Sequence, residues 1–154
     1  MQIRLAETAG FCFGVERAVA LAEQTARSCK NAVTLGPIIH NRHVVARFEL
    51  LGLREISAAD EAQPGQTVVI RAHGIPVGEQ RTLSARGALM VDATCPFVKK
   101  IHVIAQKAER DGRSLLIIGT PTHPEIIAIA SYSSDAHVFQ SAEALETWLT
   151  ERPE

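Results

Sequence analysis

Apolar positions along the chain form two kinds of pattern, short continuous runs and longer stretches with helical spacing. The short runs predict strands at residues 3–6, 32–35, 67–71, 88–91, 114–118 and 137–139. Apolar residues three and four positions apart predict helices around residues 15–22, 41–51, 76–86, 96–111, 124–130 and 142–149. Strands that alternate with helices in this way predict an α/β fold with a parallel sheet and helices on both of its faces.

The length of the chain and three local segments bear on how this fold is organised. The length of 154 residues is typical of one domain, and the segment Thr94 to Pro96 is the best candidate for an internal boundary. The run SLLII at 114–118 predicts a strongly buried strand, and the last predicted helix leads to no further strand.

Composition excludes several classes of protein. Apolar residues make up 46% of the chain and charged residues 21%, which is too apolar for a disordered chain. Lys and Arg number 16 against 17 Asp and Glu, and the net charge of -1 gives no support for binding to nucleic acid or to a membrane surface. No apolar run reaches about 18 residues, so we expect no transmembrane helix. No basic-then-apolar leader opens the chain, so we expect a cytoplasmic protein.

Residue types that carry chemistry follow the predicted strands. Ligands of open α/β sheets bind outside the carboxyl ends of the strands, so these positions are the first place to look for a site. Five successive strand exits each carry one Cys or His, namely Cys12, His40, His73, Cys95 and His123. Their shared position predicts one common site.

The three cysteines differ in their placement. An odd number argues against a disulfide framework and leaves buried thiols, metal ligands or a reactive thiol. Cys12 and Cys95 stand directly before helices, whose N-termini favour thiolate over thiol, and thiolates that face one crevice suit a zinc ion or an iron–sulfur cluster. Burial as small apolar side chains is the alternative. Cys29 lies near the far end of the first helix, about 20 Å from its start, and is interpreted as structural.

The histidines and one carboxylate allow two interpretations each. Three imidazoles at His40, His73 and His123 could bind a metal or an anion, or could cap helices and bond carbonyls. Glu125 could have a raised pKa beside the cluster and deliver protons, or could be a helix-start residue favoured by the helix dipole. Basic side chains near these loops could attract an anion or be solvated: Arg42, Arg71 and Lys99. The other histidines are interpreted as ordinary surface or core residues: His43, His102 and His137.

Five stretches in order, GFCFGVERAV, IIHNRHVV, IRAHGIP, VDATCPFVKK and THPE, resemble the N-terminal part of the 4-hydroxy-3-methylbut-2-enyl diphosphate reductase family. Members of this family are iron–sulfur enzymes of the methylerythritol phosphate route to isoprenoids. The resemblance implies a three-lobed family fold. Residues 1–95 would form a Rossmann-like first lobe, residues 96–154 an incomplete second α/β lobe, and the third lobe would be absent.

The resemblance also implies a chemistry. The family holds a 4Fe–4S cluster on three Cys thiolates, and Cys12 and Cys95 match two of them, whereas the third ligand comes from the missing part. His40, His73 and His123 would contact the diphosphate of the allylic substrate, and Glu125 would serve the proton relay. Two electrons from a donor such as ferredoxin or flavodoxin would convert the substrate to isopentenyl and dimethylallyl diphosphates.

One departure from the family pattern and two alternatives remain. After HPE the family has a Gly-containing stretch, where this chain has Ile126 to Ile129. A truncated, catalytically incompetent α/β module that binds a diphosphate or a metal is the first alternative. A zinc site made from Cys12, Cys95 and a histidine is the second. The sequence leaves the oligomeric state open.

Overall fold

The fold is known from a computed structural model that describes residues 2–152. Its α-helices are α1 (Phe13–Ser28), α2 (Arg42–Leu50), α3 (Val77–Ala85), α4 (Pro96–Arg110), α5 (Pro124–Ala130) and α6 (Ala142–Thr150). Its strands are β1 (Val33–Leu35), β2 (Arg54–Ile56), β3 (Thr67–Ile70), β4 (Leu89–Asp92), β5 (Leu115–Ile118) and β6 (Ala136–Phe139). A single 3-10 turn, η1, spans Ala59–Glu61. None of the helices in this described range combines the length and the apolar character needed to span a bilayer.

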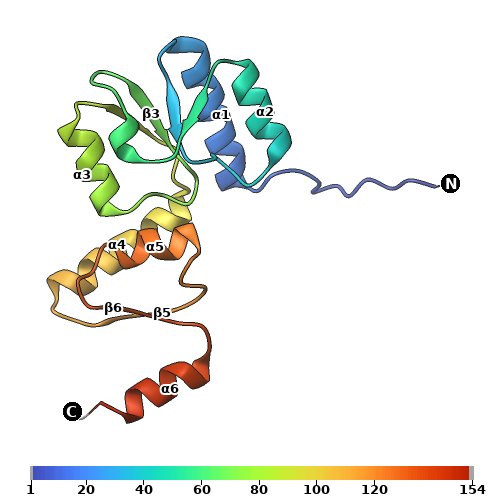
Figure 1. The fold of residues 1–154 in the computed structure, drawn as a ribbon. Coiled ribbons are helices and arrows are strands. Elements are labelled where there is room, and N and C mark those ends of the chain that lie inside the picture. The colour runs from blue at the N-terminus through green and yellow to red at the C-terminus, as the bar shows by residue number, and fades with distance from the viewer. Residues whose placement is uncertain (1, 153–154) are drawn as a thin grey trace.

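A four-stranded parallel sheet forms the larger part of the molecule, with strand order β2-β1-β3-β4. The two central strands are buried at every position because helices cover both faces of the sheet. On one face of the sheet, Val69 packs with residues of α1 and α2 in one apolar core. On the opposite face, Leu35 of β1 and Leu83 of α3 belong to a second apolar core. Figure 1 shows α3 on the side of this sheet away from α1 and α2. The predicted α/β fold with helices on both faces is therefore confirmed.

The other sheet has two parallel strands, β5 and β6, and it is separate from the first. The prediction of a strongly buried strand at 114–118 is wrong, since Leu116 is 40% exposed and Ile118 is 58% exposed. These residues share a sheet face with their partners on β6, His137 and Phe139. The helix α6 covers that face only over β6, where Trp148 packs on both partners. The β5 half of the face is left partly open to solvent.

The predicted strand at residues 3–6 is also wrong. This segment has no strand partner, and it leaves the body of the molecule as an extended tail (Figure 1). Ile3 is 79% exposed and Leu5 is 86% exposed. A strand of this length with two apolar side chains gains too little to offset the ordering of its backbone unless it pairs with a sheet edge.

Candidate functional site

The loops at the carboxyl ends of β1, β3 and β4 are joined by backbone hydrogen bonds. The Ala72 N–H donates to the Ile38 carbonyl at 3.2 Å, and the Cys95 N–H donates to the Ala72 carbonyl at 2.9 Å. Parallel strands end at the same edge of a sheet, so loops that follow them become neighbours. The loops that carry His40, His73 and Cys95 are in this way held side by side.

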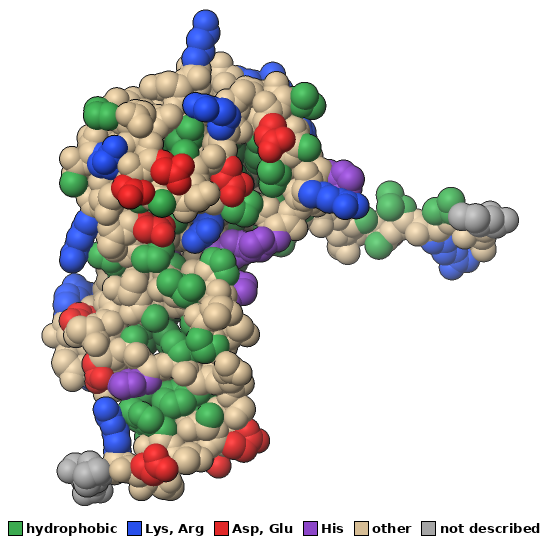
Figure 2. Space-filling model, viewed as in Figure 1, with side chains coloured by type: hydrophobic (Ala, Val, Ile, Leu, Met, Phe, Trp, Pro, Cys, Tyr) green, Lys and Arg blue, Asp and Glu red, His purple; other side chains and the backbone are tan. Residues whose placement is uncertain are grey.

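Three imidazoles meet at this edge. The ring centroids of His40 and His73 are 5.0 Å apart, and those of His73 and His123 are 5.6 Å apart. Figure 2 shows histidine side chains gathered where the four-stranded part of the molecule meets the part below it. The structure therefore brings together the three histidines that the sequence placed at separate strand exits. What they bind stays a prediction.

His73 is the most constrained of the three. Burial lowers its pKa below the ordinary value of 6.5, and the neighbouring His40, His123 and Arg71 lower it further. Its Nδ1 atom is buried and has no hydrogen-bond partner among residues 2–152. An unpaired buried polar atom costs free energy that a suitable ligand atom would recover. The described residues thus leave one nitrogen atom of the imidazole cluster, His73 Nδ1, without a hydrogen bond.

His123 both caps a helix and belongs to the imidazole cluster. Its Nδ1 atom accepts a hydrogen bond from the Glu125 N–H at 3.2 Å, so His123 caps α5. Because Nδ1 is an acceptor, the neutral ring carries its proton on Nε2, which leaves that N–H free to donate to a ligand. The capping role considered for a loop histidine is present here and is compatible with ligand binding.

Glu125 lies in the first turn of α5, two residues from His123. The residues after it, where the resembling family has a glycine, simply continue α5. Ile126 packs so closely on Gly119 that a Cβ there would lie 2.9 Å from the Ile126 Cδ1 atom. The close approach fixes the start of α5 against the end of β5.

Arg71 braces two of the loops rather than pointing into solvent. Its Nε donates to the Gly74 carbonyl at 3.2 Å, and a Cβ at Gly36 would lie 2.6 Å from its Nη1 atom. Gly36 has a φ of +69°, so a side chain there would be strained as well as obstructed. The guanidinium therefore connects the end of β1 to the turn after His73, and it keeps a positive charge near the cluster.

Cys12 and Cys95 are the N-cap residues of α1 and α4. A Cβ at Gly14 would lie 2.4 Å from the Cys95 Sγ atom, so this thiol rests on the first turn of the helix that Cys12 begins. Cys29 lies at the other end of α1, against the apolar core, as its structural interpretation predicted. Residues 2–152 contain no group of three or more His, Cys, Asp or Glu side chains arranged to hold a metal ion. The zinc site of two cysteines and a histidine therefore finds no support in this arrangement.

Sequence reasoning missed the residues that shape the Cys95 loop. The Asp92 carboxylate accepts the Thr94 N–H at 2.9 Å and pairs with Lys99 at 2.6 Å, and Arg17 Nη1 donates to the Thr94 carbonyl at 3.2 Å. Burial alone would raise the pKa of Asp92, but the bonds from Lys99 and Thr94 outweigh it and lower the pKa. The Asp-x-Thr spacing at a strand exit is the signal that could have indicated this turn, whereas nothing local indicates Arg17.

Comparisons with known proteins agree with one another. The family model for the LytB protein matches residues 3–153. A 4-hydroxy-3-methylbut-2-enyl diphosphate reductase of a Nitratiruptor species is 43% identical over 147 residues, which cover 95% of this chain and 52% of the relative. The chain thus spans about half the length of the curated relatives it matches.

Two solved structures share the fold. The first is (E)-4-hydroxy-3-methyl-but-2-enyl diphosphate reductase, described as the terminal enzyme of the non-mevalonate pathway. It matches with a TM-score of 0.80 and 39% identity, over 97% of this chain and 54% of that one. The second is the E-1-hydroxy-2-methyl-but-2-enyl-4-diphosphate reductase from Plasmodium falciparum. It matches with a TM-score of 0.84 and 26% identity, over 91% of this chain and 45% of that one.

Proposed function

We propose, since the chain belongs to the LytB protein family, that it forms the diphosphate-binding and part of the cluster-binding half of a 4-hydroxy-3-methylbut-2-enyl diphosphate reductase. The reaction replaces the substrate hydroxyl by hydrogen, consuming two electrons and two protons and releasing one water. The products are isopentenyl and dimethylallyl diphosphates. The proposal extends to this chain the activity named for its relatives, of which it covers about half.

The observation that carries the proposal is the cluster of three imidazoles around an unpaired His73 Nδ1 atom. A diphosphate presents several charged oxygens and accepts hydrogen bonds from many directions. His123 can donate from Nε2, and Arg71 adds a positive charge to the same loops. An anion would also favour protonation of His73, whose pKa is lowered by burial and by the neighbouring cations. In this proposal His40, His73 and His123 bind the diphosphate.

Glu125 is proposed as the proton donor to the leaving hydroxyl. It lies in the first turn of α5, two residues after His123, and we propose that a substrate held at the imidazoles by its diphosphate extends toward it. A carboxylic acid near a leaving hydroxyl assists its loss as water.

Cys12 and Cys95 are proposed as two thiolate ligands of a 4Fe–4S cluster. The two thiols fit part of such a ligand set, because both cap helix N-termini and Cys95 Sγ lies against the helix that Cys12 begins. Residues 2–152 contain no complete metal-binding group. A cluster with three thiolate ligands therefore needs another Cys from outside these residues. When bound, the cluster supplies electrons and a Lewis-acidic iron.

We also propose a domain arrangement, an electron donor and a cellular compartment for the reaction. Residues 1–95 form a first α/β lobe and residues 96–154 form part of a second lobe of a three-lobed fold. Ferredoxin or flavodoxin supplies the electrons, and the cytoplasm is the compartment. The alternative is a diphosphate-binding module of the same family without turnover, which the two-thiol site favours for the chain by itself.

Titration with inorganic pyrophosphate, followed by the imidazole signals in nuclear magnetic resonance, tests the binding site. We expect His40, His73 and His123 to shift together, and His73→Gln to weaken binding about tenfold or more, because a charge-assisted hydrogen bond is worth about 1.5–3 kcal/mol. His137→Gln is the matched control, since His137 contacts Asp135 and Trp148 on the other sheet. Equal weakening in both variants, or no binding by the unaltered chain, would contradict the proposal.

Anaerobic reconstitution with iron and sulfide, followed by Mössbauer spectroscopy and a turnover assay, separates the reductase from the binding module. The module binds pyrophosphate and shows no turnover under any of these conditions. A 4Fe–4S signal that disappears in Cys12→Ser and Cys95→Ser but persists in Cys29→Ser supports the cluster assignment. The same signal in all three variants would overturn it.

A further inference from the structure

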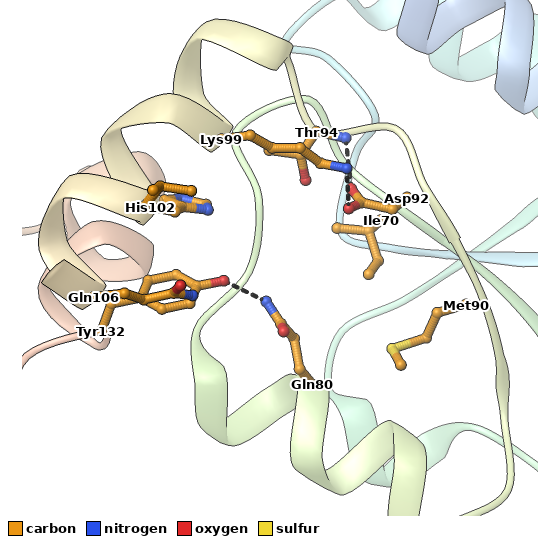
Figure 3. A pocket seen from close by; sticks show the side chains of 10 residues that line it. Ile70, Gln80, Met90, Asp92, Thr94, Lys99, His102, Gln106 and Tyr132 are labelled. Carbon is orange, nitrogen blue, oxygen red and sulfur yellow. Dashed lines mark hydrogen bonds and ion pairs between the residues drawn. The ribbon is translucent and has the colours of Figure 1, made fainter. Parts of the chain in front are cut away.

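Gln80 of α3 joins two segments that come from different parts of the fold. Its Nε2 amide donates to the Tyr132 hydroxyl oxygen at 2.7 Å (Figure 3). The same amide donates to the Ile75 carbonyl at 3.3 Å. Both amide hydrogens are therefore in use. Ile75 lies two residues after His73, and Tyr132 lies two residues after the end of α5. One side chain in this way ties the His73 turn to the helix that His123 caps.

His102 of α4 contacts both Tyr132 and the turn that follows His73. It is 6% exposed, and its ring stacks on Tyr132 with centroids 4.6 Å apart. A Cβ at Gly74 would lie 2.6 Å from the His102 Cε1 atom, and Gly74 has a φ of +76°. The turn directly after His73 therefore packs against the imidazole of His102 with no room for a side chain.

The helix α5 connects His123 to Tyr132, so a movement of one end of the helix moves the other end. It has seven residues and spans about 10 Å, with His123 as its N-cap and Tyr132 just beyond its C-cap, Ser131. The Val77 N–H donates to Ser131 Oγ at 3.0 Å, which adds a second bond between α3 and this end of α5. A shift of the Tyr132 end relative to α3 would move His123 relative to His73.

A cavity of about 300 Å³ lies beside Gln80, His102 and Tyr132 (Figure 3). Asp92, Lys99 and Met90 line its other walls. Because one side of Gln80 and Tyr132 faces this space instead of packed side chains, their hydrogen bond and the ring stacking hold them in place. Loss of that bond would not be compensated by the surrounding packing.

We propose that Gln80, His102 and Tyr132, the junction clamp, are positioning residues that set the separation of the His73 and His123 imidazoles. The clamp residues are not members of the imidazole cluster and act on it through the Gly74–Ile75 turn and through α5. The role of the clamp in ligand binding rests on the function proposed above, whereas its geometric role does not.

The first test measures geometry in the absence of a ligand. The nuclear Overhauser effect between ring protons of His73 and His123 is recorded for the 154-residue chain, Tyr132→Phe, Gln80→Leu and the double variant. We expect each single variant to lose half or more of the intensity, because each removes the bond between Gln80 and Tyr132. Gln80→Leu also removes the bond to Ile75, so the double variant should lose no more than Gln80→Leu alone. Ser141→Ala is the control, since it removes the N-cap bond of α6 far from the clamp and leaves the intensity unchanged.

The second test measures the dissociation constant for inorganic pyrophosphate in the same variants. We expect Tyr132→Phe and Gln80→Leu to raise it three- to tenfold, non-additively, with Ser141→Ala unchanged. Unaltered Overhauser intensity in both clamp variants overturns the inference, and so does a double variant whose loss is the sum of the single losses. If the unaltered chain does not bind pyrophosphate, the proposed function fails, and the Overhauser measurement still decides the clamp.

Discussion

At the scale of single residues, His73 and His102 share surroundings that disfavour a positive charge. Burial lowers the pKa of both below 6.5, the ordinary value for histidine. Around His73 the other imidazoles and Arg71 act in the same direction. Around His102 the Asp92 carboxylate opposes the effect of burial, and Lys99 adds to it. Both rings are therefore held neutral over a wider pH range than in the unfolded chain.

A dependence of stability on pH follows from these shifts. Between the folded-state pKa and 6.5 the unfolded chain binds more protons, so the free energy of unfolding decreases as the pH falls below 6.5. The decrease stops once the pH is below the folded-state pKa, where both states are protonated. Urea unfolding at pH 7.5 and pH 5.5 measures the difference, and His102→Gln should reduce it. An unchanged difference in that variant would contradict the assignment.

The contact between Gly14 and Cys95 gives a second prediction at this scale. In Gly14→Ala the new Cβ would lie 2.4 Å from the Cys95 Sγ atom, so we expect the thiol to be displaced toward solvent. The rate of its reaction with a disulfide reagent, measured in a background that carries both Cys12→Ser and Cys29→Ser so that Cys95 is the remaining thiol, should rise several-fold. Gly78→Ala is the matched control, because a Cβ there meets nothing within 4 Å. Equal rates in both variants would show that Gly14 is not needed for the position of the thiol.

At the scale of elements, local signals were sufficient wherever a helix had a clear start. Asn41 accepts the N–H groups of His43 and Val44 at 3.0 and 3.3 Å, and α2 begins at the next residue, one position after the predicted start at Asn41. Pro124 marks the start of α5 in the same way. The strand β2 was missed because Arg54 and Glu55 are polar, and its pairing with β1 depends on the sheet edge rather than on an apolar run.

The N-cap of α2 can be tested directly. Asn41→Ala should lower the free energy of unfolding by about 1 kcal/mol, since two N–H groups of the first turn lose their acceptor. Asn41→Asp should recover most of the loss because the carboxylate accepts the same bonds. Chemical denaturation measures both changes. A loss of the same size in Asn41→Asp would mean that the cap itself is not the cause.

At the scale of the whole molecule, the two sheets differ in how well they are covered. The central strands of the four-stranded sheet are fully buried, and the two-stranded sheet leaves Leu116 and Ile118 exposed. A sheet of two strands with one face partly uncovered has little apolar burial to stabilise it.

Hydrogen exchange should reveal this difference. We expect the amides of β1 and β3 to exchange only on global unfolding, and those of β5 and β6 to exchange at least tenfold faster through local opening. Mass spectrometry of exchanged peptides, or nuclear magnetic resonance, provides the rates. Equal protection of both sheets would mean that the chain unfolds as one cooperative unit.

Local patterns in the sequence were enough to predict the α/β class, the helices and four of the five Cys and His residues at strand exits, whereas Cys12 follows residues 3–6, which form no strand. Apolar periodicity, capping residues and the position of Cys and His relative to predicted strands are local properties, so they can be recognised without tertiary structure. The neighbouring positions of His40 and His73, 5.0 Å apart, followed from a general rule about parallel sheets. His123 follows β5 of the separate two-stranded sheet, so its approach to His73, at 5.6 Å, depends on how the two parts of the fold pack.

Which residues hold those loops in place, and which strands form, depends on contacts between distant parts of the chain. Residues 3–6 have the composition of a strand and form none, because a strand requires a partner edge that its own sequence does not supply. Gln80, His102 and Tyr132 carry no local signal, since their role arises from contacts between segments that are far apart in the chain. Pairing and packing depend on the surroundings of a residue, and those surroundings are set by the whole fold.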